Sequence, residues 1–188
     1  MLVRKFVVAS RLFVVSAVGL FWIAFTPDAL AWYTYGGCVA FKIRNVYVST
    51  ELYDEGGYAG RLRARSGSIG PWEKYTQWFS DDHRYTAFQS RANNMFVSAD
   101  ISIGGGGEGM LIANRSQIGA WESFTLLQVS SSVLSSAYGL TATMLVANSN
   151  NKVVSAEFAY GSFATGTLRA RPTGNQVGSW ELFTLYGC

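Results

Sequence analysis

The sequence predicts an all-β domain built from three copies of one motif, and two observations support this prediction. Aromatic residues make up 15% of the 188-residue chain, which also has 20 glycines and only 3 prolines. That composition is typical of short strands joined by tight turns. The second observation is an internal repeat, in which three short segments recur in the same order three times. Collinear recurrence of this kind indicates a repeated structural unit.

Three segments define the repeat. A Val-Ser strand comes first, a Leu-x-Ala strand follows, and a Trp-Glu strand ends each copy. The segments occupy 48–51, 62–65 and 70–75 in copy one, 97–100, 111–115 and 119–124 in copy two, and 154–157, 168–171 and 178–183 in copy three. Trp72 and Trp121 are 49 residues apart, whereas Trp121 and Trp180 are 59 apart. The excess falls mostly in the Ser-rich stretch 130–136.

Each copy is predicted to hold about four strands. Apolar and polar residues alternate along the strands, as at Phe124-Thr125-Leu126, with the period of two that strands show. Paired asparagines at 93–94 and 150–151 indicate hairpin turns, because Asn tolerates a positive φ. Three such units can bury their apolar faces by closing around a pseudo-threefold axis, which also removes exposed strand edges. The predicted fold is a β-trefoil, with repeats at about 39–84, 85–140 and 141–188.

The first 31 residues are predicted to be a secretory signal peptide. Three basic residues lie in the first eleven positions, an apolar run over 12–25 follows, and Ala29-Leu30-Ala31 provides a small-residue cleavage site, the three features of such a peptide. The apolar run has about 14 residues, whereas a membrane-spanning helix needs about 20. We therefore expect cleavage after Ala31, a mature domain over 32–188, a secreted or periplasmic location and no membrane attachment.

The mature domain carries little net charge. Removing 1–31 takes away three basic residues and one acidic residue, so the formal charge of +3 falls by two. No run rich in Lys or Arg remains. A nucleic-acid-binding protein needs such a basic footprint, so nucleic acid is excluded as a partner.

The two cysteines lie near the two ends of the predicted domain, at Cys38 and Cys188. An even cysteine count in an exported chain predicts a disulfide. In a closed barrel the first and last strands are neighbours, so we expect the two Cα atoms to lie within about 7 Å of each other.

The repeated segments resemble those of the fascin-like β-trefoil domains, above all the bacterial secreted type with one domain. The best stretch runs from Phe96 to Leu126 and includes a glycine run at 104–107, Leu-Ile-Ala-Asn-Arg at 111–115 and Ile-Gly-Ala-Trp-Glu at 118–122. The resemblance covers about 39–186. Copy one departs from it with a shortened first hairpin, and copy three departs with an insertion around 172–176.

The resemblance implies a binding or structural role without catalysis. Fascin crosslinks actin with several trefoils in tandem, and similar domains accompany secreted glycoside hydrolases, where carbohydrate binding is the implied role. The Gln-x-Trp signature of ricin-type lectins is absent from all three copies, so that sugar site is not transferred. Two functions stay open: weak binding of a polysaccharide or other glycan, and a protein–protein interaction or structural module of the fascin type.

Residues repeated in every copy are predicted to be structural, because repetition at one place serves the symmetry of the fold. A Trp beside a carboxylate would also suit a sugar. We expect each Trp to stabilise the fold by about 3–5 kcal/mol and each Glu to form an ion pair with the Arg that precedes it. The set is Trp72, Trp121 and Trp180, with the expected pairs Arg65–Glu73, Arg115–Glu122 and Arg171–Glu181.

Candidate ligand-binding residues lie where the copies differ. The loop between the Val-Ser and Leu-x-Ala strands has additional aromatic residues in copies one and three, and loops are where binding residues concentrate. Capping of the end of the barrel is the alternative role for these rings. The candidates are Tyr53, Asp54 and Tyr58 in copy one and Phe158, Tyr160 and Phe163 in copy three.

No catalytic site, metal site or cofactor is predicted. His83 is the only histidine, and it lies beside Asp81 and Asp82 where a polar turn is needed between copies. With both cysteines assigned to a disulfide, neither a histidine-based triad nor a zinc ligand set can be completed. A glycosidase needs two carboxylates, and no pair is marked among Asp54, Glu55 and Glu108. We expect a binding protein and not an enzyme.

Overall fold

The computed structural model describes residues 4–6, 30–53, 57–104, 106–129, 142–159, 165–171 and 177–188. Within these residues the chain forms a 14-stranded antiparallel β-structure and one short 3-10 helix, η1 (Pro71–Glu73). The all-β prediction is therefore confirmed. Most of the predicted signal peptide lies outside the described residues, so cleavage after Ala31 stays a prediction.

Six strands pair antiparallel in a ring and form a closed barrel. In ring order they are β3 (Cys38–Ile43), β6 (Tyr75–Ser80), β7 (Thr86–Ser90), β10 (Phe124–Val129), β11 (Ala142–Ala147) and β14 (Phe183–Gly187). The ring closes between β14 and β3, from Phe183↔Ile43 to Gly187↔Val39. Each barrel strand has a partner on both sides, so the barrel itself leaves no edge for another strand.

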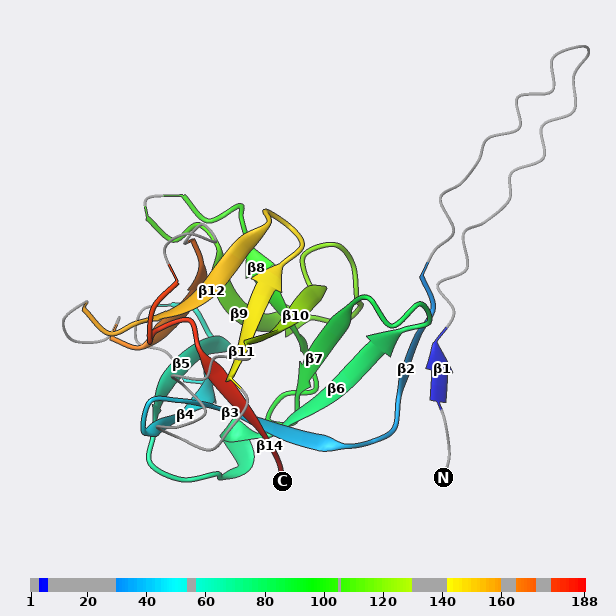
Figure 1. The fold of residues 1–188 in the computed structure, drawn as a ribbon, viewed down its shortest axis with the longest axis horizontal. Helices are drawn as coiled ribbons and strands as arrows, with labels where there is room; N and C mark the ends of the chain where they lie inside the picture. Colours follow the sequence, from blue (N-terminus) through cyan, green and yellow to red (C-terminus); the bar gives the residue numbers. More distant parts are fainter. Residues whose placement is uncertain are drawn as a thin grey trace, which may run out of the picture.

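Three hairpins close one end of this barrel. They are β4 (Val46–Glu51) with β5 (Arg61–Ser66), β8 (Phe96–Asp100) with β9 (Met110–Arg115), and β12 (Lys152–Glu157) with β13 (Thr167–Ala170). The second strands of the hairpins also pair with one another in a triangle, β5 with β9, β9 with β13 and β13 with β5. Each third of the sequence thus supplies four strands, two to the barrel and two to the cap (Figure 1). The fold is a β-trefoil.

One glycine in each repeat locks the three hairpins together. Ala113 donates its backbone N–H to the carbonyl of Gly60 at 2.8 Å, and the equivalent bonds run from Ala170 to Gly109 and from Ala64 to Gly166. A Cβ atom added at any of the three glycines would lie 2.4–2.5 Å from the carbonyl oxygen of the facing alanine, and all three have a positive φ of 74–90°. Only glycine fits this approach without strain.

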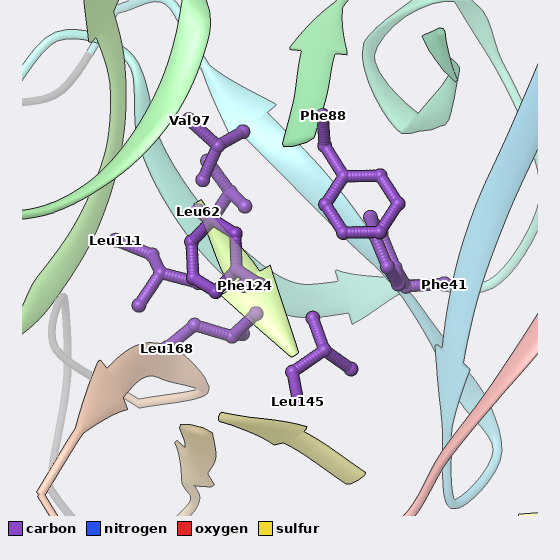
Figure 2. A pocket seen from close by; sticks show the side chains of 8 residues that line it. All are labelled: Phe41, Leu62, Phe88, Val97, Leu111, Phe124, Leu145 and Leu168. Carbon is purple, nitrogen blue, oxygen red and sulfur yellow. The ribbon is translucent and has the colours of Figure 1, made fainter. Parts of the chain in front are cut away.

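The core lies on the pseudo-threefold axis and is filled by equivalent residues from the three copies. Figure 2 shows aromatic and aliphatic side chains from several strands converging there. They enclose an apolar cavity lined by Phe41, Leu62, Phe88, Val97, Leu111, Phe124, Leu145 and Leu168. The cavity has a volume of about 10 Å³, at the lower limit for one water molecule. With no polar group in its lining, it is a small packing gap and not a ligand site.

One polar pair interrupts the apolar symmetry of the core. Tyr75 stands where the other copies have Phe124 and Phe183, and its buried hydroxyl donates to the Val48 carbonyl at 3.3 Å. Thr50, which stands where the other copies have alanine, donates to the same hydroxyl at 3.1 Å. Because a buried hydroxyl without a partner is costly, the two polar substitutions compensate each other, and burial raises the pKa of Tyr75.

The predicted disulfide is confirmed. Cys38 and Cys188 are bonded, their Cα atoms are 5.1 Å apart, and the backbone N–H of Cys188 donates to the Cys38 carbonyl at 3.1 Å. The bond joins the start of β3 to the end of the chain beside β14, which are neighbouring barrel strands.

A short N-terminal extension lies outside the barrel. β2 (Trp32–Thr34) pairs with β6 on one edge and with β1 (Arg4–Phe6) on the other. In Figure 1 β2 runs beside β6, and β1 lies on the far side of β2. Trp32 anchors β2 in a second, smaller apolar cluster with Trp78, Ala87 and Phe96.

Candidate functional site

The repeated Trp-Glu pairs lie in turns before the last strand of each copy, and not within that strand as the sequence predicts. In copy one they form η1, and β6 starts only at Tyr75. The glutamates are buried, with 5–6% of their surface exposed, whereas Trp72, Trp121 and Trp180 are half-buried. The expected contribution of about 3–5 kcal/mol from each Trp stays a prediction.

Each buried glutamate closes its own turn by accepting a backbone N–H three residues earlier. Gly119 donates to Glu122 at 2.8 Å, and the equivalent bonds from Gly70 to Glu73 and from Gly178 to Glu181 measure 2.7 and 2.6 Å. Glu73 also accepts a hydrogen bond from the Ser49 hydroxyl. These carboxylates hold the turn that precedes each last strand.

Two of the three expected ion pairs have a different acidic partner. Arg65 bonds Glu51 at 2.6 Å and not Glu73. Arg171 contacts Glu157 at 2.7 Å in place of the expected Glu181. In register, Glu51 faces Arg61 and Glu157 faces Thr167. Each arginine lies four residues further along the facing strand, so its long side chain reaches back along the hairpin to the acid.

The third expected ion pair is present but long. Arg115 lies 3.9 Å from Glu122 and 3.6 Å from Asp100, which occupies the position of Glu51 and Glu157 in its repeat. In every copy, therefore, the arginine reaches the acid that ends the Val-Ser strand.

Each repeated tryptophan has a different neighbour. The Trp72 ring lies 6.3 Å from Tyr53, between ring centroids, and the Trp180 ring lies 6.0 Å from Phe158. The Arg115 guanidinium is 5.4 Å from the centre of the Trp121 ring, within the range of a cation–π contact. The scaffold is thus threefold, but the surface around each tryptophan is not.

The predicted ligand-binding residues are placed differently in copies one and three. Tyr53 is 85% exposed and Tyr58 is 38% exposed. Phe158 is half-buried, packs against the main core, and has the Arg44 guanidinium 5.4 Å from its ring centre, so it acts more as a cap on the barrel. Asp54, Tyr160 and Phe163 lie outside the described residues.

Glu122 should give the domain a measurable pH dependence. Burial raises its pKa, opposed by hydrogen bonding from Gly119 and the charge of Arg115. Because the folded state holds this proton more tightly than the unfolded state does, the carboxyl stabilises the fold most at a pH below its unfolded pKa of about 4.5. Proton linkage then requires that this stabilisation is lost as the pH rises above that value. Glu122→Gln keeps the acceptor for Gly119 and cannot titrate, so its stability relative to the parent should increase from pH 4 to pH 7.

Urea unfolding at both pH values measures this effect, and Glu108→Gln, the same change at an exposed residue, is the matched control. A Glu122→Gln variant that loses stability relative to the parent as pH rises would contradict the assignment.

The sequence analysis missed an aromatic cluster on the N-terminal extension. Tyr33, Tyr35, Phe79 and His83 have ring centroids 5.3–6.0 Å apart, and the Tyr33 hydroxyl lies 2.7 Å from Nδ1 of His83. His83 does lie in the turn between β6 and β7, as expected. The aromatic alternation directly after the predicted cleavage site, Trp-Tyr-Thr-Tyr at 32–35, was the signal that could have revealed the cluster.

The described part of the chain holds neither a cluster of metal ligands nor a membrane-spanning helix. No three His, Cys, Asp or Glu side chains among the described residues are grouped as metal ligands. In the same residues, no helix is long and apolar enough to cross a membrane.

Comparison with known proteins confirms the fold. No protein-family model matches the chain, and no curated protein matches it. Among solved structures, the designed threefold-symmetric protein ThreeFoil matches with a TM-score of 0.59 and 15% identity over 79% of this chain and 97% of that chain. The BEL β-trefoil matches with a TM-score of 0.57 and 10% identity over 81% of this chain and 94% of that chain.

A larger enzyme contains a segment of the same fold. A GlcNAcα1-4Gal-releasing endo-β-galactosidase from Clostridium perfringens matches with a TM-score of 0.55 and 11% identity, over 81% of this chain but only 32% of that chain. Identities this low show the shared fold alone. The β-trefoil prediction is confirmed, whereas the resemblance to the fascin-like domains stays a prediction.

Proposed function

We propose that this protein is an exported, non-catalytic module of the fascin-like β-trefoil kind that binds a polysaccharide weakly through Tyr53 and Trp72. The observation that carries the proposal is the aromatic surface formed by exposed Tyr53 and half-buried Trp72, whose rings are inclined at 49° with centroids 6.3 Å apart. A tyrosine that is 85% exposed contributes little to folding. Aromatic faces suit the C–H side of a sugar ring.

Polar groups suited to sugar hydroxyls lie next to this surface along the chain. Glu51 precedes Tyr53 by two residues and holds Arg65 through bonds of 2.8 and 2.6 Å. The Arg65 side chain is 50% exposed, and a guanidinium has five N–H donors. Arg65 therefore has donors to offer a ligand while Glu51 fixes its position.

The other two tryptophans are less suited to the same task. A cation already lies over the Trp121 ring, and the Phe158 ring meets Trp180 at 75°. We therefore assign one such surface to the trefoil, in copy one. A single shallow contact is expected to bind a sugar with millimolar affinity, which corresponds to a binding free energy of about 4 kcal/mol. Retention of the protein then needs a polymer that offers the same sugar many times.

The carboxylates near this surface support binding without hydrolysis. A glycosidase directs one acid and one base at the scissile bond, whereas Glu51 is bonded to Arg65 and buried Glu73 is bonded to Gly70 and Ser49. No cofactor is invoked. The disulfide supports an oxidising, extracytoplasmic location. The endo-β-galactosidase in the comparisons acts on a glycan, and its trefoil-like part is a minority of that chain.

Retention on insoluble polysaccharides tests the proposal. We expect the parent to be retained on at least one of cellulose, chitin and xylan, and Tyr53→Ala and Trp72→Ala each to reduce retention. Each ring contact beyond simple burial contributes about 0.5–1.5 kcal/mol, so the double variant should bind at least about fivefold more weakly. Tyr53→Ala should unfold at the same urea concentration as the parent because its ring is exposed.

Trp121→Ala is the matched control, since it removes the equivalent tryptophan and should lower stability by a similar amount while leaving retention unchanged. A folded Tyr53→Ala/Trp72→Ala variant that is retained like the parent removes this surface from consideration. If the parent is retained on no polysaccharide, the protein-interaction module becomes the better account.

A further inference from the structure

The N-terminal extension carries an aromatic cluster that the trefoil does not need. The cluster consists of Tyr33 and Tyr35 from the extension, Phe79 of β6 and His83 of the next turn, and we call it the N-terminal aromatic cluster. The six barrel strands close without β2, so the cluster is an addition to one edge of the fold.

Packing alone does not explain these rings. Side chains alternate along β2, and Trp32 on one face is 6% exposed and anchors the strand in the smaller apolar cluster. Tyr33 lies on the opposite face, against Phe79, at 5.9 Å between ring centroids. Tyr35 follows it and is 53% exposed. A half-exposed tyrosine stabilises the fold little, and Trp32 already anchors β2. Tyr35 is therefore not needed to hold the strand in place.

The backbone around Tyr35 is held in place on both sides. The Thr34 hydroxyl donates to the Gln77 carbonyl at 2.7 Å, and the Gly36 N–H donates to the Thr34 hydroxyl at 3.0 Å. The Arg91 guanidinium donates to the Gly36 carbonyl at 3.1 Å. A ring presented on a fixed backbone loses little entropy when it binds a ligand, so this geometry suits recognition.

Polar groups converge beside the rings. The Tyr33 hydroxyl lies 2.7 Å from Nδ1 of the exposed His83. Asp81 directly follows Ser80, which pairs with Trp32 of β2, so it lies at the same edge of the fold. Asp81 is exposed. Flat rings flanked by a hydroxyl, an imidazole and a carboxylate provide a stacking face together with hydrogen-bond donors and acceptors.

We propose that the N-terminal aromatic cluster is a second carbohydrate contact, in which Tyr35 and Phe79 meet the apolar side of a sugar ring and Asp81 and His83 meet its hydroxyls. The proposal rests on the proposed function for the class of ligand. Two separate contacts on one protein strengthen its retention on a repeating polymer, because the second contact forms at a high effective concentration.

Because His83 is the only histidine, its imidazole proton signals report on this cluster alone. The test is an NMR titration of the exported protein with soluble oligomers of glucose, N-acetylglucosamine and xylose. The His83 signals and the Trp72 indole signal, assigned with Trp72→Phe, are followed together. We expect both to shift and saturate with at least one oligomer, and Tyr35→Ala to abolish the His83 shift while the Trp72 shift persists.

Retention on the matching insoluble polymer should fall at least tenfold in Tyr35→Ala, whereas Leu127→Ala, which removes another exposed apolar side chain, should bind like the parent. If Trp72 responds and His83 does not, the second contact is wrong and the proposed function stands. If His83 responds and Trp72 does not, the second contact stands and the Tyr53–Trp72 surface is wrong. If neither responds to any oligomer, both proposals are overturned.

Discussion

Replacing both Cys38 and Cys188 by Ser is expected to lower the free energy of unfolding by about 3–5 kcal/mol. The disulfide spans a sequence separation of 150, and a closed loop of that size restricts the unfolded chain strongly, up to about 5 kcal/mol in the chain-entropy model. For a domain of this length the loss corresponds to a fall in Tm of roughly 10–15 °C. Urea and thermal unfolding of the double variant measure it.

Reduction of the parent with dithiothreitol is the control for this variant, because it opens the same bond without changing side-chain size. The reduced parent and the double variant should unfold at the same urea concentration. Equal stability of the oxidised parent and the double variant would show that the bond contributes nothing and that pairing of β14 with β3 alone closes the barrel.

Replacing Gly109 by Ala should cost about 2–5 kcal/mol. A Cβ at this position would lie 2.5 Å from the Ala170 carbonyl oxygen, which Gly109 faces at a φ of +74°. A left-handed conformation costs a non-glycine residue about 1–2 kcal/mol, and forced overlap with packed backbone adds about 1–3 kcal/mol. Because this contact joins β9 to β13, the variant should unfold at a clearly lower urea concentration.

Gly106→Ala separates the two contributions. Gly106 is in the same loop and has a φ of +88°, but nothing lies within 4 Å of an added Cβ. It should cost only the conformational part, about 1–2 kcal/mol. Equal losses in the two variants would contradict the proposed role of close approach between hairpins.

The fold could be predicted from the sequence because the repeat marks positions that the threefold core requires. Leu62, Leu111 and Leu168 recur at the same point of each copy and all lie in the core. Recurrence shows that a position matters, but it does not show how deeply a side chain is buried. For this reason the sequence could not show that the repeated tryptophans are half-buried.

The partners of the repeated arginines could not be read from sequence distance. Arg65 is close along the chain to Glu73, yet its side chain bonds Glu51, 14 residues earlier on the other strand of the β4–β5 hairpin. The N-terminal aromatic cluster was missed for a related reason. It joins Tyr33 and Tyr35 to Phe79 and His83, about 50 residues away. It also lies outside the repeat from which the structural and ligand-binding residues were predicted.

The most direct test of the carbohydrate-binding account is a glycan-array screen of residues 32–188 beside the Tyr53→Ala/Trp72→Ala variant. The account predicts weak binding of the parent to at least one class of polysaccharide or oligosaccharide, and loss of that signal in the folded variant. A parent protein that binds no glycan on the array, or a variant that binds the same glycans as strongly as the parent, would contradict it.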